Sequence, residues 1–230
     1  MQKYLINLRI NKMKKEPFNP TIFYANPSFI RRYQSKYAKI FLPGETVLDV
    51  GCGSGIFLEL LQERQVNGIG IDTSAEVLRD GIAKGLHIEH GDALSYLKKK
   101  KNLYDGIMLS HIIEHLHPPD LINLLELANK RLKPNGRVIV ITPNFKDIDV
   151  ATSTFWLDIT HVRPYPLPLL KQLFEYSGFS VVSMGNDPDT GGGRPPYSRV
   201  LSFIRYIYRK IRFGQYSGKG DIFLIAKKIG

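Results

Sequence analysis

The chain has 230 residues, of which 43% are apolar and 23% are charged. This composition suits a folded chain with a sizeable hydrophobic core and excludes an intrinsically disordered protein. No stretch approaches the ~18–20 consecutive apolar residues of a membrane-spanning helix, and Arg9 interrupts the only apolar run that could resemble a secretory signal. The single cysteine, Cys52, allows neither an internal disulfide nor a cysteine-based zinc site. We therefore expect a cytoplasmic protein with one domain over residues 1–230.

The net charge of +11 is concentrated at the two ends of the chain. Residues 1–40 carry nine Lys or Arg and one Glu, a net +8, and residues 188–230 carry nine Lys or Arg and two Asp, a net +7. The stretch between them is slightly acidic. Two basic ends suit an anionic partner such as a membrane surface, a nucleic acid or a phosphate-bearing substrate. Simple solubility charge is the alternative explanation.

Strand and helix patterns alternate along the chain. Apolar spacing and end signals predict helices over residues 27–41, 55–65, 74–84, 93–99, 119–132 and 166–177, and strands over residues 46–50, 67–71, 87–89, 104–110, 137–142, 179–183 and 221–227. A turn is expected at Pro134-Asn135-Gly136, before the fifth strand. Such alternation predicts a mostly parallel sheet with helices on both faces. Ligands bind to these sheets at the carboxyl ends of the strands.

The string VLDVGCGSG, residues 47–55, is the most informative motif. Its glycines permit a tight turn and let a ligand approach the bare backbone. The spacing Gly51-x-Gly53-x-Gly55 differs from the G-x-G-x-x-G of nicotinamide-dependent dehydrogenases, which are the rival enzyme class. Asp49 lies at the strand end, where it would repel a pyrophosphate but attract a cationic ligand.

Two further aspartates follow the second and third strands. Asp72, in GIGIDTS, can accept hydrogen bonds from both hydroxyls of a ribose, or it can cap the next helix. Asp92, in HGDAL, can reach an adenine amino group, and its alternative is again a helix cap.

Taken together, these strings resemble the class I S-adenosylmethionine-dependent methyltransferases. VLDVGCGSG resembles their first motif, IGIDTS the second and GDAL the third, while YDGIMLSHIIEHL and LKPNGRVIVITPN resemble their fourth and fifth strands. The resemblance implies a Rossmann-like α/β fold with a seven-stranded, mostly parallel sheet whose last strand is antiparallel. It implies S-adenosylmethionine as cofactor, bound by Asp49, Gly51, Gly53, Gly55, Asp72, Asp92, Ala93 and Ser110. In this arrangement Asp92 and the Ala93 backbone hold the adenine, and Ser110 lies close to the methyl donor.

The stretch His111-Ile112-Ile113-Glu114-His115 follows the fourth strand. It formally matches the H-x-x-E-H pattern of zinc peptidases, but Pro118-Pro119 would interrupt the long helix that those enzymes need, so no metal is expected. The better interpretation is a segment that lines the active site, with His111 or His115 near the acceptor. A packing role for each histidine is the alternative.

A second polar cluster lies in FWLDITHVRPYPLPLL, residues 155–170. It resembles the D-x-T-H-x-R-P-Y stretch of methyltransferases encoded with lipopolysaccharide and other surface-glycan genes, and the wider pattern resembles ubiquinone-biosynthesis-type enzymes. On that basis His161 is the best general-base candidate and Asp158 orients it. Arg163 and Tyr165 would contact the substrate, Arg163 through a phosphate or carboxylate. The alternative is a loop that only docks the following helix.

About 30 residues separate the last two predicted strands, where these methyltransferases usually have a near hairpin. Residues 188–220 include a Gly/Pro-rich loop and a predicted amphipathic helix with an apolar arc and an opposite basic side. This basic insertion could pack on the domain, rest on anionic lipid at the inner face of the membrane, or contact RNA.

These observations predict methyl transfer from S-adenosylmethionine to oxygen of a glycan, which could be lipid-linked, or of another small-molecule acceptor. A non-catalytic cofactor-binding module, a methyltransferase acting on a quinone-type phenol, and one acting on RNA remain open alternatives.

Overall fold

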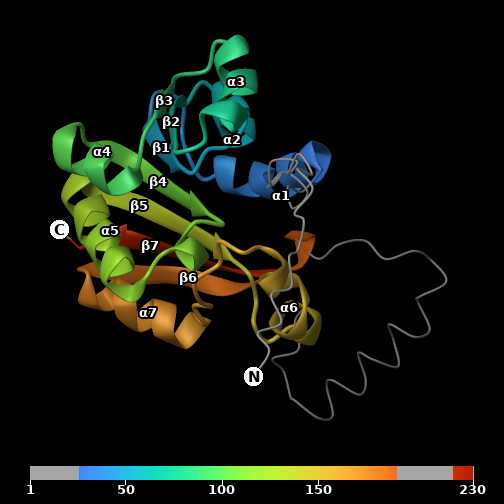
Figure 1. Cartoon of the computed structure of the whole chain (residues 1–230). Helices are drawn as coiled ribbons and strands as arrows, with labels where there is room; N and C mark the ends of the chain where they lie inside the picture. The colour runs from blue at the N-terminus through green and yellow to red at the C-terminus, as the bar shows by residue number, and fades with distance from the viewer. Residues whose placement is uncertain (1–25, 191–219, 230) are drawn as a thin grey trace, which may run out of the picture.

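The computed structural model describes residues 26–190 and 220–229, which form a seven-stranded sheet flanked by helices (Figure 1). The strands are β1 Thr46–Val50, β2 Asn67–Asp72, β3 Ile88–His90, β4 Tyr104–Ser110, β5 Leu132–Thr142, β6 Phe179–Asp187 and β7 Asp221–Lys228. The α-helices are α1 Pro27–Ala38, α2 Ile56–Gln62, α3 Ala75–Ala83, α4 Ala93–Lys99, α5 Pro118–Arg131, α6 Ile148–Thr152 and α7 Leu167–Tyr176. Short 3₁₀ turns are η2 Ile113–His115, η3 Thr154–Leu157 and η4 Pro188–Thr190.

The strand order is β3-β2-β1-β4-β5-β7-β6. Strands β1 to β5 pair in parallel, whereas β7 runs antiparallel to both β5 and β6. The predicted Rossmann-like fold, including the antiparallel last strand, is therefore confirmed. The chain winds outward from β1 to β3 and then crosses back to β4, so the direction of winding changes between β1 and β4. Ligands of open α/β sheets bind in the crevice at this position.

Most predicted elements appear within two or three residues of their expected bounds, and β1, α4 and β4 coincide with them. Two differences concern strand length. The predicted turn at residues 134–136 is instead part of β5, where Asn135 adopts a left-handed φ of 63° and the pairing with β4 shifts register. Strand β6 continues to Asp187 because it pairs with β7 along its whole length. The segment between β5 and α7, for which no element was predicted, contains α6 and η3.

The hydrophobic core has two halves, one on each face of the sheet. Side chains of β4 alternate between them, with Ile107 and Leu109 on one side and Met108 on the other, as the period of two in a strand requires. Helices α4, α5 and α7 cover the first face, and α1, α2 and α3 cover the second (Figure 1). The carboxyl ends of β1 and β4 open between these two layers.

The basic residues 1–25 and the predicted amphipathic helix within the 188–220 insertion lie outside the described residues. The membrane and RNA contacts expected of these segments therefore stay predictions. The predicted helix over residues 27–41 is present as α1, which begins after the cap residue Asn26. Among the helices that the structure describes, none is long and apolar enough to cross a membrane.

Candidate active site

The glycine-rich loop leaves the carboxyl end of β1 and turns into α2. Gly51, Gly53 and Gly55 have φ values of 71°, 53° and 84°, in the left-handed region that residues with a side chain avoid. A Cβ on Gly51 would lie 1.9 Å from Cδ1 of Ile112, so a side chain at this position would force Ile112 to move. The loop therefore presents bare backbone at the crevice between β1 and β4.

Asp72, at the end of β2, ties the loop to the next helix. Its Oδ2 accepts a hydrogen bond from the backbone N–H of Gly53 (3.0 Å), and its Oδ1 accepts one from the N–H of Ser74 (2.9 Å). Ser74, rather than Asp72, is the cap of α3, since its hydroxyl faces the N–H of Val77. Each Asp72 oxygen keeps a further lone pair for a ligand.

Asp49 is a buried carboxylate, with 3% of its surface exposed, beside the same loop. Burial raises the pKa of this carboxyl well above its usual value, and the nearby charge of Asp72 raises it further. No hydrogen bond to its side chain comes from within residues 26–190 and 220–229. A carboxylate without a local donor, next to bare backbone, fits a ligand that carries positive charge and hydrogen-bond donors. These residues thus suit a sulfonium nucleoside such as S-adenosylmethionine.

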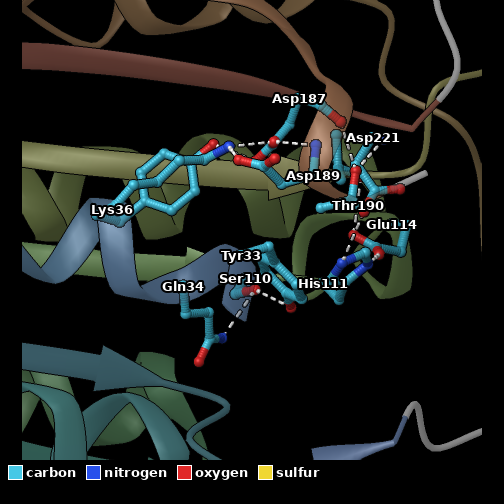
Figure 2. A network of polar contacts seen from close by, with 12 residues as sticks. Tyr33, Gln34, Lys36, Ser110, His111, Glu114, Asp187, Asp189, Thr190 and Asp221 are labelled. Carbon is cyan, nitrogen blue, oxygen red and sulfur yellow. Dashed lines mark hydrogen bonds and ion pairs between the residues drawn. The ribbon is translucent and has the colours of Figure 1, made fainter. Parts of the chain in front are cut away.

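Asp92 follows β3 and Ser110 ends β4, at the same edge of the sheet as the glycine loop. Asp92 is the N-cap of α4, and its Oδ1 accepts from the N–H of Ser95 at 2.9 Å, which corresponds to the alternative interpretation of this residue. This bond lowers the pKa of Asp92 and leaves the other oxygen for a ligand. Ala93 is the first residue of α4. The hydroxyl of Ser110 lies 3.4 Å from the amide Nε2 of Gln34 in α1 (Figure 2).

His111, predicted near the acceptor, sits between two carboxylates (Figure 2). Its Nδ1 is 3.2 Å from Oε1 of Glu114 and its Nε2 is 3.3 Å from Oδ2 of Asp221. Burial alone would lower the pKa of His111, but the charge of Asp221 and the hydrogen bonds to both carboxylates raise it well above its usual range. His111 thus links the end of β4 to β7 through two carboxylates, and its role near the acceptor stays a prediction.

Sequence analysis missed the contribution of α1 to this end of the sheet. Tyr37 donates a hydrogen bond of 2.6 Å to the buried carboxylate of Asp187, and Lys36 forms ion pairs with Asp187 and Asp189 (Figure 2). Asp187 ends β6. The N–H of Asp221, the first residue of β7, donates to the hydroxyl of Thr190, which follows β6 by three residues. These contacts bring β6, β7 and α1 together, and no local sequence signal marks them.

The structure pairs His115 with His161, although they come from different loops. Their ring centroids are 4.7 Å apart. Nδ1 of His161 lies 2.6 Å from the backbone oxygen of Phe155, which can only accept, so this nitrogen carries the proton and Nε2 keeps the lone pair. The Thr160 hydroxyl donates its one proton to Oδ1 of Asp158, at 2.6 Å. It therefore accepts a hydrogen bond from Nδ1 of His115, at 2.8 Å.

Two details differ from the predicted arrangement of this loop. Phe155 orients His161, whereas Asp158 lies 3.9 Å from Nε2 and holds Thr160. Tyr165 is buried, and its hydroxyl donates to the carbonyl of Leu116 at 2.8 Å, which suits the docking alternative rather than contact with a substrate. The guanidinium of Arg163 stacks over the Tyr165 ring, 5.1 Å from its centroid.

Comparison with known proteins agrees with this geometry. A family model described as a methyltransferase domain matches residues 23–184. The ubiquinone biosynthesis O-methyltransferases of Pectobacterium carotovorum subsp. carotovorum (strain PC1) and Pseudomonas paraeruginosa (strain DSM 24068 / PA7) are 32% and 31% identical over 109 and 111 residues. These matches cover 44% and 45% of this chain and 44% and 46% of the relatives, so they span less than half of either protein.

Solved structures extend the likeness to nearly the whole fold. A SAM-dependent methyltransferase from Archaeoglobus fulgidus superposes with a TM-score of 0.74 and 28% identity, over 90% of this chain and 97% of that one. The Haemonchus contortus phosphoethanolamine N-methyltransferase 2, solved with S-adenosyl-L-methionine, gives a TM-score of 0.66 at 14% identity, over 94% and 59% of the two chains, and shows the shared fold alone. The chain therefore belongs to the methyltransferase-domain family, and its fold is that of the SAM-dependent methyltransferases.

Proposed function

We propose that the enzyme transfers the methyl group of S-adenosylmethionine to a hydroxyl oxygen of a small-molecule acceptor, and that a glycan is the preferred class of acceptor. The observation that carries this proposal is the tautomer of His161. Because Nδ1 donates its proton to the Phe155 carbonyl, Nε2 keeps a lone pair that can accept a proton. Methyl transfer needs an in-line approach of the acceptor, and a hydroxyl also needs a group that takes its proton. His161 is the candidate base, and His115 lies beside it.

The residues of the crevice support a defined place for the donor. The backbone of Gly51, Gly53 and Gly55 would face the methionine and ribose, and Asp49 would offset the positive charge of the ligand. Asp72 would accept from the ribose hydroxyls. Asp92 and Ala93 would hold the adenine, and Ser110 would lie near the methyl group. S-adenosylmethionine supplies a methyl group activated by its sulfonium.

Two features favour a glycan that carries a phosphate or a lipid. The side chain of Arg163, near His161, could hold an anionic group. An exposed apolar strip lies in α6 and η3 and just after them, and consists of Ile148, Trp156, Leu157 and Ile159. Apolar side chains that face water beside an active site suit a lipid-linked acceptor or a membrane surface. Co-sedimentation with anionic vesicles at low salt tests the membrane contact, and failure to sediment would argue against it.

A second acceptor class is a quinone-type phenol. It is favoured by the partial identity to the ubiquinone biosynthesis O-methyltransferases. A phenol has a lower pKa than a sugar hydroxyl and places less demand on a base, so the two classes differ in how strongly they depend on His161.

The test is a methyl-transfer assay with isotope-labelled S-adenosylmethionine and two acceptor panels, nucleotide sugars and dihydroxybenzoates. Mass spectrometry and NMR of the product locate the methyl group. We expect an O-methylated product and a loss of rate of about 10²-fold or more in His161→Gln, with unchanged binding of S-adenosylhomocysteine.

His117→Gln is the matched control, because this histidine is exposed and lies only two residues from His115. Methylation at nitrogen, or a His161→Gln enzyme as fast as the wild type, would contradict the proposal. A chain that binds the donor but methylates neither panel would instead favour the non-catalytic module.

A further inference from the structure

The H-x-x-E-H pattern at residues 111–115 takes on a different meaning in the folded chain. Its first histidine is engaged by Glu114 and Asp221 and cannot serve as a ligand. His161, from another loop, takes the place of this first histidine, because its ring packs against that of His115. The sequence motif is thus broken, but the fold assembles a comparable set of groups from two segments.

We infer that Glu114, His115 and His161 bind a divalent transition-metal ion of the zinc and cobalt class. One ligand atom from each of the three residues lies within 4.8 Å of the other two. Nitrogen and carboxylate ligands bind Zn²⁺ at about 2.0–2.2 Å, so small side-chain movements bring all three to one ion. Two imidazoles with one carboxylate suit zinc, cobalt, nickel or iron better than magnesium or calcium, which prefer oxygen ligands.

The surroundings of the two histidines provide an independent argument. Metal-binding histidines almost always donate their second ring N–H to a carbonyl, carboxylate or similar acceptor, which fixes the tautomer. The N–H of His161 is held by the Phe155 carbonyl, and that of His115 by Thr160, which in turn donates to Asp158. Both rings therefore keep the Nε2 lone pair.

The charge and burial of the cluster also favour a cation. Glu114 is fully buried, so its carboxylate is held in a fixed position. Its two oxygens accept from His111 and Thr142 and keep lone pairs for a metal. A second carboxylate, that of Asp158, lies 3.9 Å from Nε2 of His161. Two carboxylates beside two imidazoles therefore give this corner the ligand types that such an ion takes.

A metal here would deepen the proposed function, on which the following consequence rests. A bound divalent ion lowers the pKa of a coordinated hydroxyl group. With the metal on Nε2 of His161, the acceptor hydroxyl would lose its proton to solvent water instead of to that nitrogen.

The test is a titration of the full chain, freed of metal by a chelator, with Co²⁺ alone, followed by visible absorption. It needs neither donor nor acceptor, so its outcome is separate from that of the methyl-transfer assay. We expect one Co²⁺ per chain, displaced by Zn²⁺, and an affinity at least about tenfold weaker in His115→Gln and in His161→Gln. His117→Gln serves as the control, with an affinity like that of the wild type.

Circular dichroism and binding of S-adenosylhomocysteine show whether each variant is folded. Absence of Co²⁺ binding to the wild type would overturn the inference. So would binding that folded His115→Gln and His161→Gln variants retain in full.

Discussion

Replacement of Gly51 by alanine tests whether the loop needs bare backbone for a steric reason as well as a conformational one. Gly44 provides a matched control, because its φ of 83° is also left-handed but an added Cβ would meet nothing within 4 Å. The left-handed backbone alone should cost each alanine variant about 1–2 kcal/mol of unfolding free energy. At Gly51 the Cβ would overlap Cδ1 and Cγ1 of Ile112 at 1.9 and 2.6 Å, and such overpacking adds about 1–3 kcal/mol.

Urea unfolding of Gly44→Ala, Gly51→Ala, Ile112→Ala and the Gly51→Ala/Ile112→Ala double variant measures both contributions. In the double-mutant cycle, Gly51→Ala should destabilise the Ile112→Ala background much less than the wild-type background, because truncation of Ile112 removes the atoms that overlap the new Cβ. S-adenosylhomocysteine should raise the melting temperature of Gly44→Ala as it does that of the wild type, and raise that of Gly51→Ala less. Equal destabilisation of the two glycine variants, with no coupling to Ile112, would refute the steric argument.

Two further predictions concern stability. His111→Asn removes the charged link while keeping a residue that tolerates a φ of 54°. Folding raises the pKa of His111, so its contribution to stability is complete below the usual value of 6.5 and is lost as the pH rises through the pKa of the folded state. In urea unfolding, the free energy of unfolding of the wild type should therefore decline above pH 6.5, and that of the variant should not. The pKa of Glu114 is lowered on folding, so the stability that this carboxylate contributes is lost only at acidic pH, below about 4.5. An identical pH dependence of wild type and variant above pH 6.5 would disprove the stabilising role of His111. Tyr165→Phe deletes the hydrogen bond to the Leu116 carbonyl and should cost about 1 kcal/mol in the same assay; no loss of stability would mean that this hydroxyl serves something other than the docking of its loop.

The donor half of the site could be predicted from the sequence because its signals are local. The three glycines of the loop follow a buried strand within nine residues, and their spacing alone indicates a sharp turn into a helix. Asp72 was left open as a ribose ligand or as the cap of the next helix, and the structure shows Ser74 as the cap. For Asp92 the sequence left both a cap and an adenine ligand open, and the structure shows the cap while leaving one carboxylate oxygen for a ligand.

The acceptor half was predicted less completely, since its geometry depends on contacts between distant segments. His111 or His115 was expected near the acceptor and His161 as the base, and the structure shows that a carboxylate from β7 contacts His111. Asp158 was expected to orient His161, and the structure adds the Phe155 carbonyl, a backbone group that no sequence pattern identifies. Tyr33 and Gln34 of α1, which approach Ser110, escaped notice entirely.

The amino-acid sequence by itself determined the order of strands and helices, the position of the glycine loop and the enzyme family. These depend on patterns that extend over about ten residues, and the backbone responds to them within one turn or strand. Only the tertiary structure decided which histidine lies between two carboxylates, which two histidines pack together, and which helix approaches Ser110. Those choices depend on chain segments that meet only when the sheet forms, such as Tyr33 and Ser110, which are 77 residues apart.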